Sequence, residues 1–269
     1  MIDFDVVLTK ISSTSDLNID GCTDHIIPVC ERQSVSSELC DAQILWYDYV
    51  RNEWRKVSSI SDDVNHTDLY FHPSRSTYGF ELPVTVRAGD VDSDGYVDLI
   101  TVMRDYKDEK MRAVILRSVK DDTTRPLGRK FVPIWTSEQL KITDDVELAS
   151  FLDVQENGKL DVIMTTRNAT NHYNLLWARN TLMEGACFLK VLVTTGLCIG
   201  GNCPNDKVPY GTNLAGPFVC YETSNIDGEL IKGCATQLSQ SGHSALQMPY
   251  SVFGLGESPN FVETVTTSI

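Results

Sequence analysis

The chain has 269 residues, of which 42% are hydrophobic, and a formal net charge of −14 at pH 7. The ordinary apolar fraction argues against disorder, and the length suits one large all-β domain or two smaller ones. The acidity argues against nucleic acid as a partner, because phosphate binding needs a basic face.

The first element with a chemical signature is a loop at residues 16–24, called loop 1 below. It carries oxygen-bearing side chains at positions 1, 3, 5 and 9 and a glycine at position 6, and a strand-like run follows at residues 25–29. Ca²⁺ takes six to eight oxygen ligands, one of them the carbonyl at position 7, and glycine permits the sharp turn. The predicted calcium ligands of loop 1 are Asp16, Asn18, Asp20, the Cys22 carbonyl and Asp24.

Loop 2, at residues 90–98, is the most complete copy, with aspartate at all four side-chain positions. An EF-hand has a bidentate Glu at position 12, but Thr101 stands there, and the β-branched run at residues 97–103 is typical of a strand. The alternative is a solvated Asx turn, which does not need four aspartates. The predicted ligands of loop 2 are Asp90, Asp92, Asp94, the Tyr96 carbonyl and Asp98.

Loop 3, at residues 153–161, carries less charge, because Gln155 and Asn157 replace acids. We expect weaker binding here, and the alternative is a turn that has lost its metal. In all three loops the protein occupies every ligand position, so the predicted cofactor is structural Ca²⁺. The predicted ligands of loop 3 are Asp153, Gln155, Asn157, the Lys159 carbonyl and Asp161.

The loops begin at residues 16, 90 and 153, a spacing of tens of residues that is typical of repeat folds. Between them, strand-like runs occur at residues 42–49, 82–87, 111–117, 130–136, 147–152 and 173–178. About four strands per repeat fits a β-propeller blade. No long run has a 3.6-residue apolar period, so helices should be few and short.

The pattern changes near residue 185, after which no complete calcium loop occurs. Strand-like runs at residues 188–194, 217–222, 230–238 and 261–267 alternate with Gly- and Pro-rich connections, including residues 254–256. The sequence Asn225 to Gly228 lacks acids at both ends and is read as a hairpin turn. We therefore predict a propeller domain at residues 1–185 and a small β-sandwich domain at residues 186–269.

Eight cysteines and two glycosylation sequons, at Asn65 and Asn168, favour an oxidising, extracellular location. The predicted disulfides are Cys198–Cys203, Cys220–Cys234 and Cys30–Cys40. Cys198 and Cys203 could also be half of a zinc site, but no second pair with ligand spacing follows. The partners of Cys22 and Cys187 are left open.

Catalytic motifs are not evident. The five histidines form no HExxH motif, and no GxSxG sequence occurs. His243 lies near Ser239 and Ser241, which is more simply a polar turn than a hydrolase site. We predict that the protein is not an enzyme; the alternative is a secreted enzyme or redox protein that uses the propeller as a scaffold.

The loop-and-strand repeats resemble the FG-GAP repeats of integrin-α-type β-propellers. Residues 235–243 and 252–256 resemble the domain that follows such repeats in the UnbV/ASPIC group. Together with residues 196–198 and Cys203-Pro204, these features are similar to the T-cell immunomodulatory protein (TIP, or linkin) family, most specifically over residues 87–100 and 186–269.

This resemblance implies an all-β fold, namely a partial FG-GAP β-propeller of about three blades followed by a small β-sandwich. It also implies a single-pass membrane glycoprotein on the extracellular side of the plasma membrane, or a secreted form, that functions in cell adhesion and T-cell modulation. Its partners would be cell-surface or extracellular proteins. We expect the signal peptide, several blades and the transmembrane helix to be missing from this chain, so that membrane contact would require that missing helix.

Overall fold

The computed structural model describes residues 13–32, 40–60, 68–75, 79, 81–182, 185–196, 203, 211–224, 228, 230–239, 248–256 and 261–268. Within these ranges the fold is all-β, as predicted, and its helical elements are short 3₁₀ turns, including η2 (Asp122–Thr124) and η3 (Ser137–Leu140). The described part contains no helix with the length and hydropathy needed to cross a bilayer.

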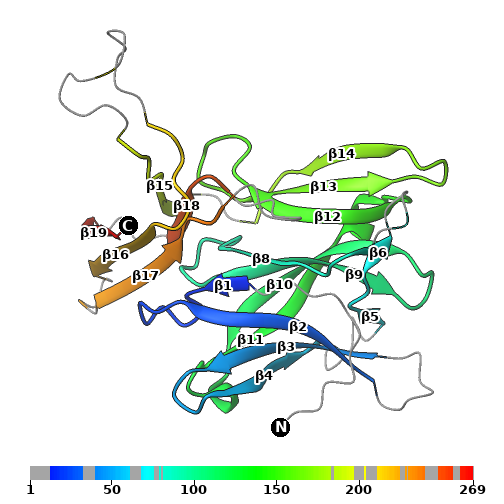
Figure 1. Cartoon of the computed structure of the whole chain (residues 1–269), viewed down its shortest axis with the longest axis horizontal. Helices are drawn as coiled ribbons and strands as arrows, with labels where there is room; N and C mark the ends of the chain where they lie inside the picture. The colour runs from blue at the N-terminus through cyan, green and yellow to red at the C-terminus, as the bar shows by residue number, and fades with distance from the viewer. Residues whose placement is uncertain are drawn as a thin grey trace.

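Three antiparallel sheets lie one above another and are called blades 1 to 3 (Figure 1). Blade 1 consists of β1 (Ser13–Ser15), β2 (Asp24–Arg32), β3 (Cys40–Asp48) and β4 (Glu53–Ser59). Blade 2 consists of β5 (Leu69–Tyr70), β8 (Val86–Gly89), β9 (Asp98–Asp105), β10 (Met111–Lys120) and β11 (Arg129–Thr136). Blade 3 consists of β12 (Asp145–Leu152), β13 (Asp161–Arg167) and β14 (Tyr173–Ala178). A separate hairpin pairs β6 (Ser74–Arg75) with β7 (Glu81–Leu82).

The hydrophobic core lies between the blades, and blade 2 is covered on both faces. Successive side chains of a strand point to opposite faces of the sheet. Accordingly, Leu99 and Leu116 pack toward blade 1, while Ile100 and Ile115 pack toward blade 3. All four side chains are at most 4% exposed. A strand buried on both faces reads as a continuous apolar run, which explains the sequences of β9 and β10.

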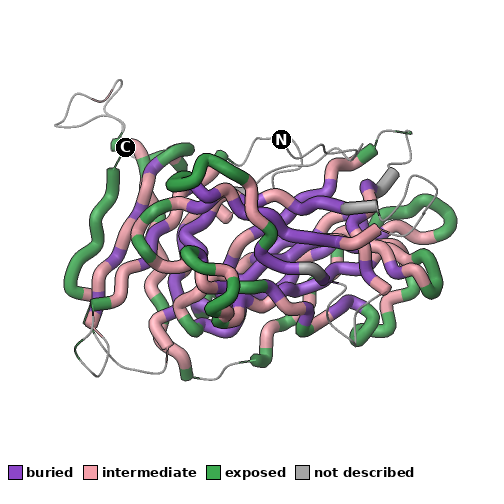
Figure 2. Tube along the Cα trace, turned by 90° about the horizontal axis from the view of Figure 1, so that it is seen from below, coloured by how far each residue is buried: buried purple, intermediate pink, exposed green. Residues whose placement is uncertain are grey.

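The C-terminal strands form two small sheets, called the C-terminal sandwich. One sheet pairs β15 (Cys187–Val191) with β18 (Ser251–Gly256), and the other has the order β17 (Leu230–Thr236), β16 (Phe218–Ser224), β19 (Val262–Ser268). Val219, Tyr221 and Phe253 form the core between them. β19 is exposed along most of its length (Figure 2).

Two of the predicted disulfides are present. Cys30 and Cys40 join β2 to β3 with a Cα–Cα distance of 5.4 Å. Cys220 and Cys234 lie directly opposite each other on β16 and β17, 4.2 Å apart at Cα.

The strand prediction differs from the structure in several places, and the short strands β1, β5 and β6 were not predicted. The run predicted at residues 82–87 is divided between β7 and β8, because Pro83 has no N–H to donate to a strand ladder. β4 was not predicted, because its charged side chains hide its pairing with β3. Residues 254–256 were predicted as a connection, although Gly254 and Gly256 lie within β18.

Because β9 lies between two other blades, we expect substitution of its buried side chains to lower the free energy of unfolding strongly. Replacing Leu99, which is fully buried, by Ala should cost about 3 kcal/mol of unfolding free energy, since a cavity remains. Leu175→Ala on β14 is the matched control, because Leu175 is 71% exposed and its loss should cost about 0.5 kcal/mol or less. Urea denaturation measures both variants, and equal losses would show that β9 is not a core strand.

Candidate metal centre

The three loops have the same backbone conformation and the same place in their blades. Each connects two neighbouring antiparallel strands of its blade: β1 to β2, β8 to β9 and β12 to β13. Ile19, Ser93 and Glu156 at position 4 have φ between 54° and 59°, and the glycine at position 6 has φ between 79° and 90°. Glycine adopts this left-handed conformation without strain, which is why it recurs there.

The first aspartate of each loop closes the turn through its side chain. The carboxylates of Asp16, Asp90 and Asp153 accept hydrogen bonds from the backbone N–H groups at positions 5 and 6, at 2.9–3.1 Å. The side chain at position 5 in turn accepts from the N–H at position 7, at 2.8–3.0 Å. The protein therefore holds these oxygens in place before any ligand binds.

Loop 2 has the donor set of a hard-cation site. Carboxylate oxygens of Asp90, Asp92 and Asp98 lie within 4.8 Å of one another, and all three residues are buried. Among the residues that the structure describes, no other acidic triplet is gathered so closely. Asp92 Oδ1 is buried and has no hydrogen-bond partner in the protein, whereas Asp92 Oδ2 lies 2.6 Å from the guanidinium of Arg117. A buried oxygen without a partner beside two further carboxylates fits a Ca²⁺ ligand.

Burial and the charges of neighbouring aspartates raise the pKa of Asp90 and Asp98 in loop 2 and of Asp16 in loop 1. The pKa of Asp90 rises to about 7, first because it is buried and then because of the charge of Asp94. The pKa of Asp98 rises well above its ordinary value, again first through burial. In loop 1, burial raises the pKa of Asp16 to about 7. A cation bound in either loop would favour the charged carboxylates and lower these pKa values again.

Loop 1 is similar but more open. Asp24 is fixed at 2.9 Å by the backbone N–H of Leu17 and at 2.7 Å by the indole N–H of Trp46. Asp20 at position 5 is exposed and accepts a hydrogen bond from the Asn18 amide at 3.0 Å. Loop 1 thus presents the predicted oxygen groups from one turn, with less burial than loop 2.

Loop 3 has a different environment. Gln155 and Asn157, the predicted ligands at positions 3 and 5, are both exposed. Asp161 Oδ1 accepts from the N–H of Asn180 at 2.8 Å, and Asp161 Oδ2 is buried without a partner. Asp153 Oδ2 lies 3.1 Å from the ammonium group of Lys190. The loop keeps the turn of the other two but not their acid set.

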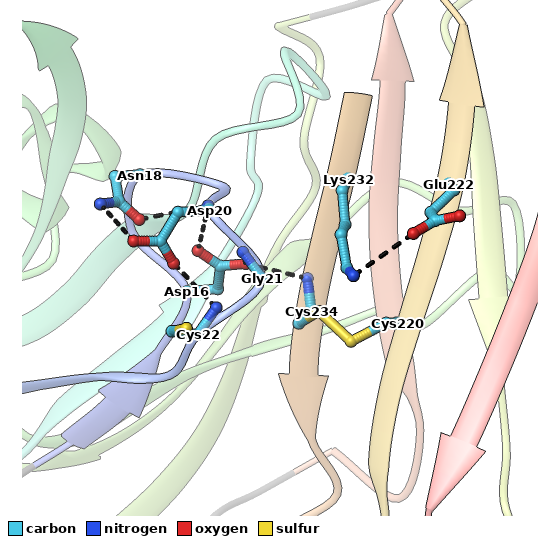
Figure 3. Close-up of a disulfide and its surroundings, with 9 residues drawn as sticks. All are labelled: Asp16, Asn18, Asp20, Gly21, Cys22, Cys220, Glu222, Lys232 and Cys234. Atoms are coloured by element: carbon cyan, nitrogen blue, oxygen red, sulfur yellow. Dashed lines mark hydrogen bonds and ion pairs between the residues drawn. A yellow bond between two sulfur atoms is a disulfide. The ribbon is translucent and has the colours of Figure 1, made fainter. Parts of the chain in front are cut away.

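All three loops contact the C-terminal sandwich through the first aspartate. Asp16 Oδ2 accepts from the N–H of Cys234 on β17 at 3.2 Å, beside the Cys220–Cys234 disulfide (Figure 3). Asp90 Oδ2 accepts from the N–H of Gly254 on β18 at 3.0 Å. A Cβ on Gly254 would lie 2.1 Å from that same oxygen, so the approach requires glycine. The sandwich therefore lies directly on the loops.

The remaining predicted site residues are placed as follows. Asn65 and Cys198 lie outside the described residues, so the Cys198–Cys203 disulfide and the first sequon stay predictions. Asn168 lies in the turn between β13 and β14, where its side chain accepts from Thr170. Cys22 is exposed and Cys187 half-buried, and neither is in a disulfide. Arg117, Lys190 and Gly254 were not predicted as site residues. For Gly254, a glycine within a strand was the available signal.

The raised pKa values predict how the metal-free protein responds to pH. Asp16 and Asp90 have pKa values of about 7 in the folded protein and 3.8 as the ordinary value, so the folded state binds more protons between these limits. Stability in a chelator should therefore fall as the pH rises from about 4 through 7. Thermal melting in EDTA should give a higher Tm at pH 6 than at pH 8, and Asp90→Asn should reduce this difference. A higher Tm at pH 8 would contradict the assignment.

Comparison with known proteins identifies relatives along nearly the whole chain. A family model described as "ITFG1, C2 domain" matches residues 209–269, the region for which the sequence suggested the UnbV/ASPIC group. The T-cell immunomodulatory protein of Rattus norvegicus is 31% identical over 272 residues, which cover 98% of this chain and 43% of the relative. The Homo sapiens protein of the same name is 31% identical over 266 residues, covering 96% of this chain and 42% of the relative.

Protein linkin of Caenorhabditis elegans is 22% identical over 265 residues, covering 94% of this chain and 41% of the relative. The chain therefore spans less than half the length of these relatives. Their similarity runs through both the blades and the C-terminal strands, so it includes the loops described above. The chain belongs to the T-cell immunomodulatory protein and linkin family.

Proposed function

We propose that this chain is part of an extracellular, calcium-stabilised binding protein that modulates T cells through cell-surface or extracellular partners. Relatives named T-cell immunomodulatory protein support the activity. The buried cluster of Asp90, Asp92 and Asp98 carries the calcium proposal. Two disulfides support the oxidising compartment.

Calcium in this proposal is a structural ion. In loops 1 and 2 the ligands come from one turn and from the start of the next strand, so an ion would fix the geometry between the two strands that the loop connects. The same first aspartates hold the C-terminal sandwich, so an ion would also stabilise that contact. The proposal also includes FG-GAP repeats, a domain boundary near residue 185, glycosylation, and a single-pass membrane anchor in the longer protein.

A binding role accounts for the surface better than the enzyme alternative, which requires a deep pocket with converging catalytic groups. A cavity of about 210 Å³ on blade 2, lined by Asp68, Asp105 and Arg112 among others, is smaller than the roughly 300 Å³ of small-molecule sites. A second cavity, of about 90 Å³, lies between the blades and the sandwich. Its polar lining includes Ser15, Asp90 and Tyr250 and, within the described part of the chain, no histidine. Asp90 is already engaged by three backbone N–H groups, so it is not placed as a general base.

Calcium should raise the melting temperature, because an ion that binds only the folded state stabilises it by about 2.7 kcal/mol at 100 times its Kd. Asp92→Asn should weaken binding at loop 2 by about tenfold or more, since ligand charge sets affinity. Asp122→Asn is the matched control, because Asp122 is exposed and pairs with nearby Arg125. Titration calorimetry with Ca²⁺ measures the affinity, and melting with and without EDTA measures the stabilisation. No heat of binding and no shift of Tm would reject the calcium proposal.

The partner proposal is tested by binding of the fluorescently labelled chain, glycosylated in a secretory host, to T cells. We expect saturable binding in Ca²⁺ and weaker binding in EDTA or with Asp92→Asn, because the loops position the sandwich. Asp122→Asn should bind like the unaltered chain. Binding that is absent in every condition would exclude a T-cell partner for this part of the protein, and binding insensitive to EDTA would separate the loops from recognition.

A further inference from the structure

Lys190 of the C-terminal sandwich reaches into loop 3. Its Nζ lies 3.1 Å from Asp153 Oδ2 and 3.9 Å from the ring centroid of Tyr250. The Asp153 side chain is fully buried and that of Lys190 is 25% exposed. A buried carboxylate without a counter-charge is strongly destabilising, so the Lys190 ammonium group stabilises the folded state by neutralising Asp153.

The direction of Lys190 follows from its place in β15. Side chains alternate along a strand, so Lys190 and Phe188 share one face while Leu189 and Val191 share the other. Leu189 and Val191 pack in the sandwich core. Phe188 lies against loop 3, since a Cβ on Gly158 would lie 2.1 Å from its ring. The sandwich thus presents an aromatic ring and an ammonium group to the same turn.

The oxygen groups of loop 3 do not fit a calcium ion as those of loop 2 do. Where loop 2 has buried Asp92, loop 3 has exposed Gln155, and Asn157 brings no charge at position 5. Asp153 Oδ2 accepts from both the Gly158 N–H and the Lys190 ammonium. In loops 1 and 2 the equivalent oxygen meets a neutral backbone N–H of the sandwich instead.

We propose that Lys190 is the built-in cation of loop 3, so that this loop binds no calcium and fastens the C-terminal sandwich to blade 3 whether or not calcium is present. Loops 1 and 2 would hold the sandwich in a calcium-dependent way, and loop 3 in a calcium-independent way. The inference stands on the contacts of Lys190 and does not depend on calcium binding by the other loops.

A double-mutant cycle in EDTA tests the pair directly. Asp153→Asn and Lys190→Met should each raise the unfolding equilibrium constant by about tenfold or more, because each leaves a charge without its partner. The double variant should be closer to the unaltered chain than the product of the two effects predicts. Lys190→Arg should largely keep the stability of the unaltered chain, because the positive charge remains. Lys130→Met is the matched control, because Lys130 forms an exposed pair with Asp121, and it should change the constant by less than about fivefold.

Independent, multiplicative effects of Asp153→Asn and Lys190→Met in urea denaturation would overturn the proposal. If either variant is too unstable to measure, Lys190→Gln and Lys190→Arg still separate the roles of length and charge. In that comparison the Lys190→Arg variant should be more stable than the Lys190→Gln variant, and equal stability of the two would overturn the proposal.

Calcium stoichiometry provides the second test. Asp153→Asn should leave the number of bound ions unchanged, whereas Lys190→Met combined with Gln155→Asp and Asn157→Asp should add one. Loss of one ion on Asp153→Asn would overturn the proposal, because loop 3 would then be a calcium site. If the unaltered chain binds no calcium at all, the function proposed for loops 1 and 2 fails, while the added ion in the triple variant still supports the role of Lys190.

Discussion

The structure depends on one repeated interaction, in which a buried aspartate accepts hydrogen bonds from both its own loop and a distant strand. Asp16, Asp90 and Asp153 each accept two backbone N–H groups of their turn and one donor of the C-terminal sandwich. A buried carboxylate is costly unless it is paired, so these hydrogen bonds stabilise both the turn and the position of the sandwich. Local turn geometry and long-range packing are therefore linked at the same atoms.

The loops meet the sandwich together because the blades are stacked. Alternate side chains of β9 and β10 bury themselves against blades 1 and 3, which places the three sheets side by side. Since each loop connects two neighbouring antiparallel strands of its blade, stacking brings equivalent loops to the same edge. Strands β17, β18 and β15 of the sandwich each meet one of them.

Loops 2 and 3 differ in the charges that surround their first aspartate. Loop 2 gathers three buried carboxylates and raises the pKa of Asp90 through burial and the charge of Asp94, which is the environment of a cation site. Loop 3 has exchanged two of its acids for amides and meets an ammonium group instead. Loops 2 and 3 thus share one turn but present different charges to the C-terminal sandwich.

Much of this protein follows from its sequence, because local backbone conformation depends on neighbouring residues. Alternating oxygen side chains with glycine at position 6 determined the three turns, and alternating apolar residues determined most strands. The 14-residue separation of Cys220 and Cys234 across a turn allowed their pairing to be inferred. β4 and β18 escaped prediction, since charged residues and glycines form strands there only through their partners, β3 and β15.

The tertiary structure decided what the loops touch. The donors to Asp16, Asp90 and Asp153 lie 218, 164 and 37 residues away in the sequence. No local pattern marks Lys190 as the partner of Asp153, because its position depends on how the sandwich packs on the blades. The sequence therefore specified three similar turns by their aspartates and glycines, and only the packing of distant strands made two of them candidate calcium sites and the third an internal ion pair.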